Sequence, residues 1–393
     1  MSRKELGQYM TPKLLADVVA DEVGECDTIV DLAIGDGALV RAVREIQGRP
    51  IFAVGFDIDR AAVSLAKQSL SNARISLSNG LAARLRLPHA SQRLAVVGNP
   101  PFLGHKTDDH GWVKRAFPDL DKKSGTDRTD VHFLARSLCI AKRYGARLTM
   151  VMPAGFADGE TCRQIRASLM RRYHLERSIE VPGRHFTDTE ARVVILVIDT
   201  GKEPASETEI VQLDQAGKVV WRKHLALSSG DRLDARYHKA RSIGGTSVCT
   251  QLQDLDVSIT RGLFSRKEAE DMHIFALHTS HLSRASRGTL KSPIRARDSA
   301  ETKCVMAHPG DILFPRTGTR VTWNAVMLEE GEAPITDHVF RIRAPEGVRS
   351  LVLQSFQHPL FRAWLEGVSK GVCATVLTKK DLMEMPVFAM QAA

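Results

Sequence analysis

The stretch Asp31-Leu32-Ala33-Ile34-Gly35-Asp36-Gly37 follows an apolar run and precedes an amphipathic segment. We predict a strand over residues 28–34, a tight turn at the glycines, and a helix over residues 38–46. Gly35 and Gly37 allow the backbone to turn sharply and to approach a ligand closely. The amides that open the following helix favour a carboxylate at the same place. Many α/β proteins use such a turn for packing alone, so it indicates a fold before it indicates a ligand.

The alternation of strand and helix continues to about residue 200 and then changes. We predict further strands at 51–56, 74–77, 94–97, 147–152, 175–181 and 192–198, and helices at 60–70, 131–144 and 160–172. This order predicts an α/β, Rossmann-like doubly wound sheet that binds ligands at the carboxyl ends of its strands. Residues 209–213 and 219–222 predict a hairpin, and helices follow at 349–365 and 379–383. We expect two domains, 1–230 and 231–393.

The chain has 393 residues and a formal net charge of +9, which favours a polyanionic partner such as nucleic acid. A solvated basic surface explains the charge equally well. The six cysteines form no C-x-x-C pair, so we predict reduced thiols with neither a disulfide framework nor a metal site. The longest apolar run, 193–198, is too short to span a bilayer, and the first residues lack a secretory signal. We therefore expect a cytoplasmic protein.

A second predicted strand ends in Gly55-Phe56-Asp57-Ile58-Asp59. An acid at this place accepts both ribose hydroxyls in dinucleotide-binding folds. We favour Asp57 for that contact, because Asp59 is placed to cap the helix that starts at Arg60. The spacing D-x-A-x-G-x-G lacks the extra residues of the dinucleotide fingerprint, which favours S-adenosylmethionine over a nicotinamide cofactor. The cofactor site predicted from these two segments consists of Asp31, Ala33, Gly35, Gly37, Asp57 and Ile58.

The tetrapeptide Asn99-Pro100-Pro101-Phe102 closes the apolar run at residues 94–98. The lone pair of an adenine N6 or cytosine N4 amine is delocalised into the ring, so catalysis must rehybridise that nitrogen. The Asn99 side-chain carbonyl and the Pro100 backbone carbonyl can each accept one N–H of the amine. Consecutive prolines hold the backbone carbonyl outward, and Phe102 can stack on a base flipped out of the duplex. A rigid strand-ending turn with one buried Phe is the alternative interpretation.

This order of motifs resembles the γ-class N6-adenine DNA methyltransferases of restriction–modification systems, beginning with Gly7-Gln8-Tyr9-Met10-Thr11-Pro12 and reaching to about residue 200. The resemblance implies a class I S-adenosylmethionine-dependent methyltransferase with a mostly parallel seven-stranded sheet. It implies that Tyr9 and Thr11 contact the methionine part of the cofactor and that Phe186 stacks on the flipped base. The residues alone also allow Thr11 to cap a helix and Phe186 to be a core residue.

The resemblance also places Asn79 and Gly80 beside the cofactor's adenine. The family usually has an Asp where this chain has Asn79, and that Asp accepts a hydrogen bond from adenine N6. An Asn can accept the same bond through its side-chain carbonyl oxygen.

The C-terminal part resembles the target-recognition modules of type I specificity subunits. The similar segments are Arg232-Leu233-Asp234-Ala235-Arg236-Tyr237-His238, residues 309–318 and residues 371–387. The resemblance implies an α+β DNA target-recognition domain. Residues 272–297 carry basic side chains and no acidic ones, which is typical of a loop along a phosphate backbone or of a solvated loop. The candidate DNA contacts are Arg284, Arg287, Lys291, Arg295, Arg316 and Arg320.

We therefore hypothesise a site-specific DNA adenine-N6 methyltransferase that uses S-adenosylmethionine, binds double-stranded DNA and acts as a monomer. It is expected to be the modification enzyme of a restriction–modification system, with cleavage left to a separate restriction endonuclease. The cofactor motifs begin at residue 7, and the segment from Pro118-Asp119 to Lys122 is a poor nuclease signature. The alternatives are methylation of RNA, of a protein glutamine or of cytosine N4, and a DNA-binding specificity subunit that needs a partner.

Overall fold

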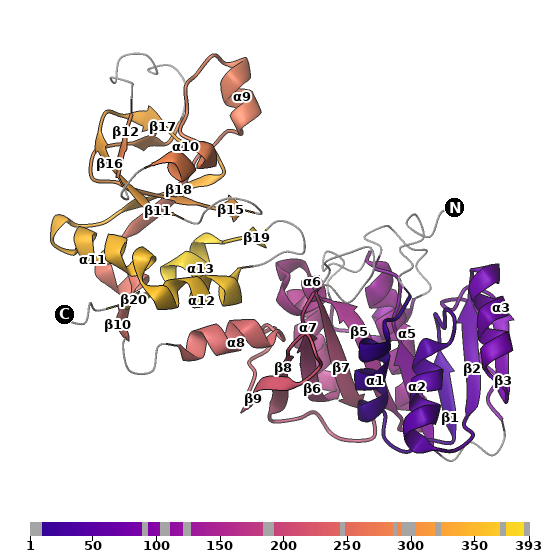
Figure 1. The fold of residues 1–393 in the computed structure, drawn as a ribbon. Coiled ribbons are helices and arrows are strands. Elements are labelled where there is room, and N and C mark those ends of the chain that lie inside the picture. Colours follow the sequence, from indigo (N-terminus) through magenta and orange to yellow (C-terminus); the bar gives the residue numbers. More distant parts are fainter. Residues whose placement is uncertain are drawn as a thin grey trace. The chain divides into compact units, whose positions relative to one another are not determined.

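The computed structural model describes residues 10–88, 93–102, 111–120, 127–183, 192–243, 248–285, 289–292, 304–318, 324–369 and 375–388. The chain divides into two compact units, Met1–Ala235 and Arg236–Ala393 (Figure 1). The first unit ends a few residues after the predicted boundary, because the connecting segment is bonded to it. Arg166 donates to the backbone carbonyl of Asp231 over 2.9 Å, and the Leu233 amide donates to the Ala157 carbonyl over 3.1 Å.

A nine-stranded sheet forms the centre of the first unit, in the order β3-β2-β1-β4-β5-β7-β6-β8-β9. Its strands are β1 Thr28–Asp31, β2 Phe52–Asp57, β3 Ala73–Leu77, β4 Leu94–Gly98, β5 Arg147–Pro153, β6 His174–Val181, β7 Val193–Asp199, β8 Thr208–Leu213 and β9 Val219–Leu225. Strands β1 to β5 run parallel to one another, whereas β7 is antiparallel to both β5 and β6. This confirms the predicted α/β class with a mostly parallel sheet.

The sheet has two strands more than the seven expected. The predicted hairpin forms as β8 and β9, but β8 also pairs in parallel with β6, where Ser178 lies opposite Ile210. The pairing extends the sheet because β8 is largely buried, with Val211 and Leu213 in the hydrophobic core. A buried strand must have its backbone groups paired, and the open edge of β6 supplies the partners.

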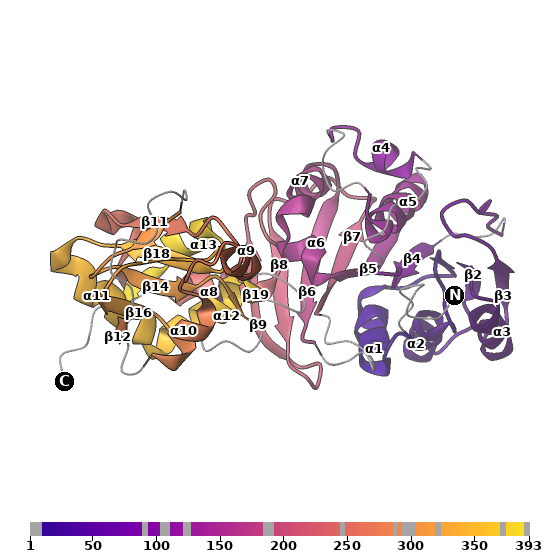
Figure 2. The ribbon, with the colours of Figure 1, turned by 90° about the horizontal axis from the view of Figure 1, so that it is seen from above.

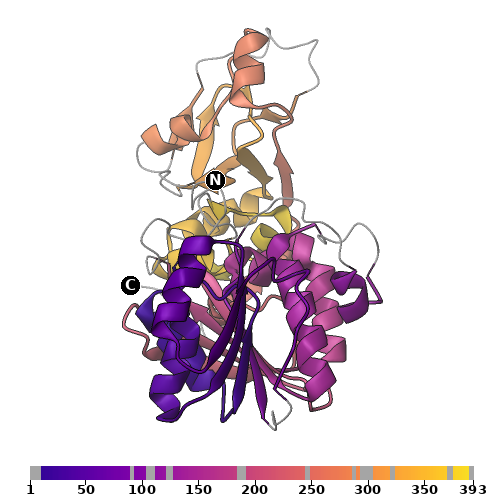
Figure 3. The same cartoon turned by 90° about the vertical axis from the view of Figure 1, so that its right-hand side faces the viewer.

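Helices cover both faces of this sheet, which explains why β1 and β4 consist entirely of buried residues. Figure 2 shows α1, α2 and α3 on one face and α4 to α7 on the other, and Figure 3 shows the strands edge-on between the two groups. Alternate residues of a strand point to opposite faces, so Ile29 joins the core under α1 and α2 and Val30 the core under α5 and α7. The helices are α1 Lys13–Glu22, α2 Ala38–Gln47, α3 Arg60–Ser69, α4 Trp112–Ala116, α5 Thr129–Tyr144, α6 Ala154–Asp158, the 3₁₀ turn η1 Glu160–Cys162 and α7 Arg163–Arg172.

The second unit is centred on a five-stranded sheet in the order β11-β18-β14-β16-β12. The strands of this unit are β10 Val248–Gln251, β11 Ser258–Arg261, β12 Thr289–Lys291, β13 Met306–Ala307, β14 Ile312–Pro315, β15 Thr317–Gly318, β16 Val326–Glu330, β17 Ala333–Pro334, β18 Val339–Arg343, β19 Thr375–Val376 and β20 Pro386–Phe388. Its helices are α9 Arg266–Asp271, α10 Thr279–Arg284, α11 Glu346–Gln357, α12 Pro359–Val368, α13 Lys379–Met383 and the 3₁₀ turn η2 Leu252–Leu255, and α8 Ala235–Ser242 leads into the unit. Phe314, Phe356 and Phe361 pack together in its core, with ring centroids 4.8 to 5.8 Å apart.

The prediction of one helix over residues 349–365 is wrong, because two helices, α11 and α12, occupy this segment. Proline has no amide hydrogen and clashes with the preceding turn, so Pro359 ends one helix and opens the next. The ring of His358 accepts a hydrogen bond from the Leu360 amide over 3.2 Å and caps the second helix. The short helix predicted over residues 379–383 is confirmed as α13. Among the helices described, none combines the length and apolar character needed to cross a bilayer.

Candidate functional site

The glycine-rich turn leaves β1 and opens α2 as predicted. Gly35 and Gly37 have φ values of 56° and 85°, a left-handed backbone that side chains other than glycine rarely adopt. A Cβ on Gly37 would also lie 2.6 Å from Leu70 Cδ1, whereas a Cβ on Gly35 would meet no atom within 4 Å. The turn is therefore packed at its second glycine and open at its first. The side chain of Asp36 accepts a hydrogen bond from the Ala38 amide over 3.2 Å at the start of α2.

Asp57, at the end of β2, holds this turn in place. Its Oδ2 accepts a hydrogen bond from the Gly35 amide and its Oδ1 one from the Asp59 amide, each over 2.9 Å. Asp59 in turn accepts a bond from the Ala61 amide over 2.8 Å, which confirms it as the cap of α3. Ile58 is 56% exposed, so an apolar side chain lies uncovered beside the buried carboxylate. A carboxylate, an open glycine and an exposed apolar side chain thus meet at one edge of the sheet.

Asp31 adds a second buried carboxyl group at this edge. It is 1% exposed, and its Oδ1 accepts a hydrogen bond from the Ala33 amide over 2.9 Å. Burial raises the pKa of this carboxyl to about 7, the Asp57 charge acts in the same direction, and the Ala33 bond opposes both. A Cβ placed on Gly98, at the end of the neighbouring strand β4, would lie 4.0 Å from Asp31 Oδ1. Asp31 therefore faces the point at which the chain leaves β4.

The tetrapeptide that begins at Asn99 starts at this point. Pro100 is buried, and Phe102 is half-buried against the core cluster that α1, α2 and α3 share. The Asn99 side-chain nitrogen donates a hydrogen bond to Thr11 Oγ1 over 3.0 Å. Asn99 Oδ1 is buried and has no hydrogen-bond partner among the described residues. A buried acceptor without a donor is costly, and such groups occur where a ligand or substrate completes the bond.

The alternative in which Thr11 caps α1, which the residues alone allowed, is wrong. The cap residue is Pro12, no side-chain cap bond forms there, and Thr11 lies one residue further out. Its hydroxyl is instead the acceptor for Asn99, a residue far away in sequence. The sequence interpretation used local helix-start preferences and had no information on this long-range contact.

Asn79 and Gly80 lie in a turn after β3 that packs against the glycine run. The Ser78 amide donates to the Asp57 carbonyl over 2.8 Å, and a Cβ on Gly80 would lie 1.8 Å from the carbonyl oxygen of Leu32. Only glycine fits at residue 80. Asn79 Oδ1 accepts a hydrogen bond from the Leu81 amide over 2.9 Å, so the oxygen expected to meet adenine already has a donor.

Sequence reasoning missed Arg136 and Trp112, whose side chains bond to this turn. Neither belongs to a motif. The available signal was Arg136 itself, because an arginine within the otherwise strongly apolar stretch of α5 must find polar partners.

The candidate DNA contacts in the second unit lie in different settings. Arg284 is exposed at the end of α10, and Arg316 is half-buried between β14 and β15. Lys291 forms an ion pair with Glu330 over 2.6 Å, which raises the pKa of the ammonium group. A phosphate contact from Lys291 would have to replace that carboxylate. The predicted residues Tyr9, Phe186, Arg287, Arg295 and Arg320 lie outside the described residues.

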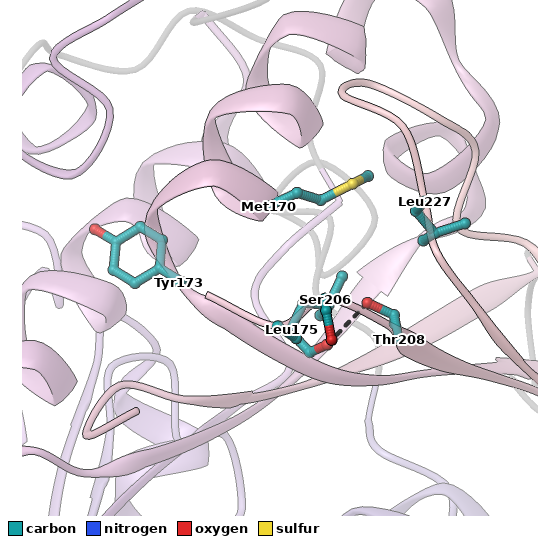
Figure 4. A pocket seen from close by; sticks show the side chains of 7 residues that line it. Met170, Tyr173, Leu175, Ser206, Thr208 and Leu227 are labelled. Carbon is teal, nitrogen blue, oxygen red and sulfur yellow. Dashed lines mark hydrogen bonds between the residues drawn. The ribbon is translucent and has the colours of Figure 1, made fainter. Parts of the chain in front are cut away.

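A small pocket elsewhere in the first unit carries none of the predicted residues. Figure 4 shows Met170 and Leu227 near Leu175, Ser206 and Thr208, with Tyr173 pointing away toward the other side. The Thr208 hydroxyl donates to the Leu175 carbonyl over 2.9 Å, and Tyr173 donates to the Ala116 carbonyl over 3.0 Å. The hydroxyls of Thr208 and Tyr173 are thus bonded within the fold.

Comparisons with known proteins agree with this description. The family model described as N-6 DNA Methylase matches residues 1–253. Among solved structures, the methyltransferase subunit of the type I restriction-modification system from Streptococcus thermophilus is 16% identical, with 61% of this chain and 54% of that chain covered and a TM-score of 0.44. The type IIG restriction endonuclease BpuSI is 14% identical, with 99% and 59% covered and a TM-score of 0.49.

The type IIL restriction-modification enzyme MmeI, in complex with DNA, is 12% identical, with 98% of this chain and 64% of that chain covered and a TM-score of 0.50. This last similarity shows a shared fold. The chain spans less than two thirds of the length of each of these three proteins. The comparison with curated proteins finds no match.

Proposed function

The chain belongs to the N-6 DNA methylase family, and from this premise we propose that it is a site-specific DNA adenine-N6 methyltransferase. It transfers a methyl group from S-adenosylmethionine to an adenine flipped out of duplex DNA, as the modification enzyme of a restriction–modification system. The fold shared with the type IIL restriction-modification enzyme MmeI supports the second part of the proposal.

The observation that carries the proposal is the buried Asn99 Oδ1 without a partner among the described residues. Its amide nitrogen is held by Thr11, so the oxygen is the part of the amide turned toward an incoming donor. An exocyclic amine provides such a donor. In the proposed reaction, the Asn99 side-chain carbonyl and the Pro100 backbone carbonyl each accept one N–H of adenine N6. The nitrogen lone pair is thereby released from the ring and can act as a nucleophile.

The residues around the glycine turn fit S-adenosylmethionine. Asp57 supplies a carboxylate at the place where ribose hydroxyls bind in related folds, and the exposed Ile58 supplies an apolar surface beside it. The open space at Gly35 leaves room for the methionine part against the start of α2. We assign Thr11, Asp31, Ala33, Gly37, Asn79 and Gly80 to the same site, together with Tyr9.

When bound, the cofactor supplies a sulfonium methyl group: the N–C bond forms, the S–CH₃ bond breaks with its electron pair left on sulfur, and the amine releases one proton to solvent. The chain's own contribution is to hold the amine by two carbonyls. Stacking of the flipped base on Phe102 and Phe186 belongs to this proposal. Asn99, Pro100 and Pro101 would keep a fixed geometry while the base flips into the site.

The second unit is proposed to read the target sequence. Its exposed arginine at residue 284 and the basic residues Lys291 and Arg316 suit contacts to phosphate or base edges. Arg287, Arg295 and Arg320 are proposed to make contacts of the same kind. Duplex DNA is therefore the proposed macromolecular substrate.

The test is methyl transfer from tritiated S-adenosylmethionine to unmodified genomic DNA by the purified full chain, with Asn99→Ala as a matched control. After digestion to nucleosides, the proposal expects the label in N6-methyldeoxyadenosine for the unaltered chain only. Label in N4-methyldeoxycytidine, in RNA or in protein glutamine contradicts the proposed substrate. Sequence-specific DNA binding without transfer would favour a specificity subunit that needs a partner.

A further inference from the structure

The turn at residues 79–83 is held at two points against residues that border the proposed cofactor site. The Ser78 amide bonds to the carbonyl of Asp57, and Gly80 sits directly on the carbonyl of Leu32. Within the turn, the Asn79 carbonyl accepts the amides of Ala82 and Ala83 over 3.0 and 2.9 Å. The inward-facing carbonyls of the turn need donors from elsewhere in the fold.

Arg136 supplies two of these donors from α5. Its guanidinium donates to the carbonyls of Gly80 and Ala83, and its side chain is nearly fully buried. Burial lowers the pKa of Arg136 to about 10, and among the described residues no carboxylate contributes to that pKa. Burying a cation without an acid partner is costly, and the two hydrogen bonds to the carbonyls of Gly80 and Ala83 offset part of that cost.

Trp112 supplies the third donor from α4. Its indole Nε1 donates to the carbonyl of Leu81 over 2.8 Å, and its ring lies under the Arg136 guanidinium, with 5.0 Å from the Arg136 Cζ to the ring centroid. The exposed Arg115 lies over the same ring at 4.8 Å. Arg136 and Trp112 thus contact each other. Together they donate hydrogen bonds to the backbone carbonyls of residues 80, 81 and 83.

We propose that Arg136 and Trp112 are positioning residues for the cofactor, because they fix the turn that carries Asn79 at the edge of its site. This inference rests on the proposed function. The turn is pre-organised against Asp57 and Leu32, so binding does not have to order it. Neither side chain needs to touch the cofactor. Their loss should weaken cofactor binding without changing the methyl-transfer step, which depends on Asn99.

The test is the dissociation constant for S-adenosylmethionine, measured by calorimetry without DNA. Trp112→Phe keeps an aromatic ring but removes the pyrrole part of the indole with its N–H, and Arg136→Lys keeps the charge but not the two-carbonyl fork. Each is expected to raise the dissociation constant about tenfold. The turnover number at saturating cofactor and the KM for DNA stay within about twofold of the unaltered chain. Arg115→Lys, on the same ring but without a bond to the turn, is the control and should change nothing.

A dissociation constant in folded Trp112→Phe that equals that of the unaltered chain overturns the inference, even if Arg136→Lys does not fold. A fall in turnover number with unchanged binding also overturns it. Binding of the cofactor by the unaltered chain without methyl transfer to DNA would contradict the proposed function and leave this binding test intact. Absence of any cofactor binding contradicts both.

Discussion

The side-chain amide of Asn99 is anchored to the hydroxyl of Thr11, with 3.0 Å between Asn99 Nδ2 and Thr11 Oγ1. This bond joins the segment before α1 to the segment after β4. It uses the donor end of the amide, so the acceptor end, Oδ1, is the one left buried and without a partner among the described residues. An amide held in this way has one N–H of its NH₂ group bonded to Thr11. In the proposed site, Thr11 therefore decides which end of Asn99 the substrate meets.

Thr11→Val removes this acceptor while keeping the shape of the side chain. The Asn99 side-chain amide can then rotate and exchange the positions of its oxygen and nitrogen. We therefore expect the turnover number to fall about tenfold. Thr11→Ser keeps the hydroxyl and should restore most of the activity. The measurement is steady-state methyl transfer with both variants at saturating cofactor. Equal turnover numbers for the valine and serine variants would contradict the role given to the hydroxyl.

Asp31 should make the stability of the first unit depend on pH. Burial raises the pKa of its carboxyl from an ordinary value of 3.8 to about 7. Between these two values the folded chain holds a proton that the unfolded chain has lost, so this group lowers the stability as pH rises through the interval. Asp31→Asn does not titrate. Its free energy of unfolding, relative to the unaltered chain, should therefore increase from about pH 4 to about pH 7 and then level off.

Urea unfolding of the two chains at several pH values measures this difference. A difference that stays constant from acid to neutral pH would contradict the effect of burial on Asp31.

Arg166 should contribute strongly to the stability of the segment that leads out of the first unit. It is 2% exposed, and its guanidinium donates to the carbonyls of Phe156, Gly159, Gly230 and Asp231 over 2.7 to 3.3 Å. Arg166→Met leaves these four carbonyls without their donor and should cost about 3 kcal/mol or more of unfolding free energy.

Arg163→Met on the same helix is the matched control. Arg163 is largely exposed and pairs with the exposed Glu160, so about 0.5 kcal/mol or less is expected. Both values come from urea unfolding curves. Similar midpoints for the two variants would show that the buried guanidinium contributes no more than the exposed one.

Local patterns predicted the parts of this protein that local forces decide. The glycine turn and the Asp59 cap follow from backbone preferences of neighbouring residues, and both form as expected. The residues alone allowed a helix cap at Thr11, because helix-start preferences are local and its observed partner, Asn99, is far away in sequence. Arg136 and Trp112 belong to no motif, and their contacts exist only after α4 and α5 pack beside the turn.

The number of strands in the sheet exceeds the predicted seven for a similar reason. A hairpin pattern specifies the pairing of β8 with β9, but it does not specify whether β8 also joins the open edge of β6. That choice depends on burial of side chains such as Val211, which the fold decides. The broken helix at Pro359 is different, because proline chemistry alone would have predicted the break.

The most direct measurement of the central claim is the single-turnover rate of methyl transfer by Asn99→Ala, together with its dissociation constant for S-adenosylmethionine. If the Asn99 carbonyl acts on the target amine, the rate falls by roughly a hundredfold or more while cofactor binding stays within about twofold of the unaltered chain. A rate equal to that of the unaltered chain, or a loss of cofactor binding that accounts for the whole decrease, would contradict the assignment.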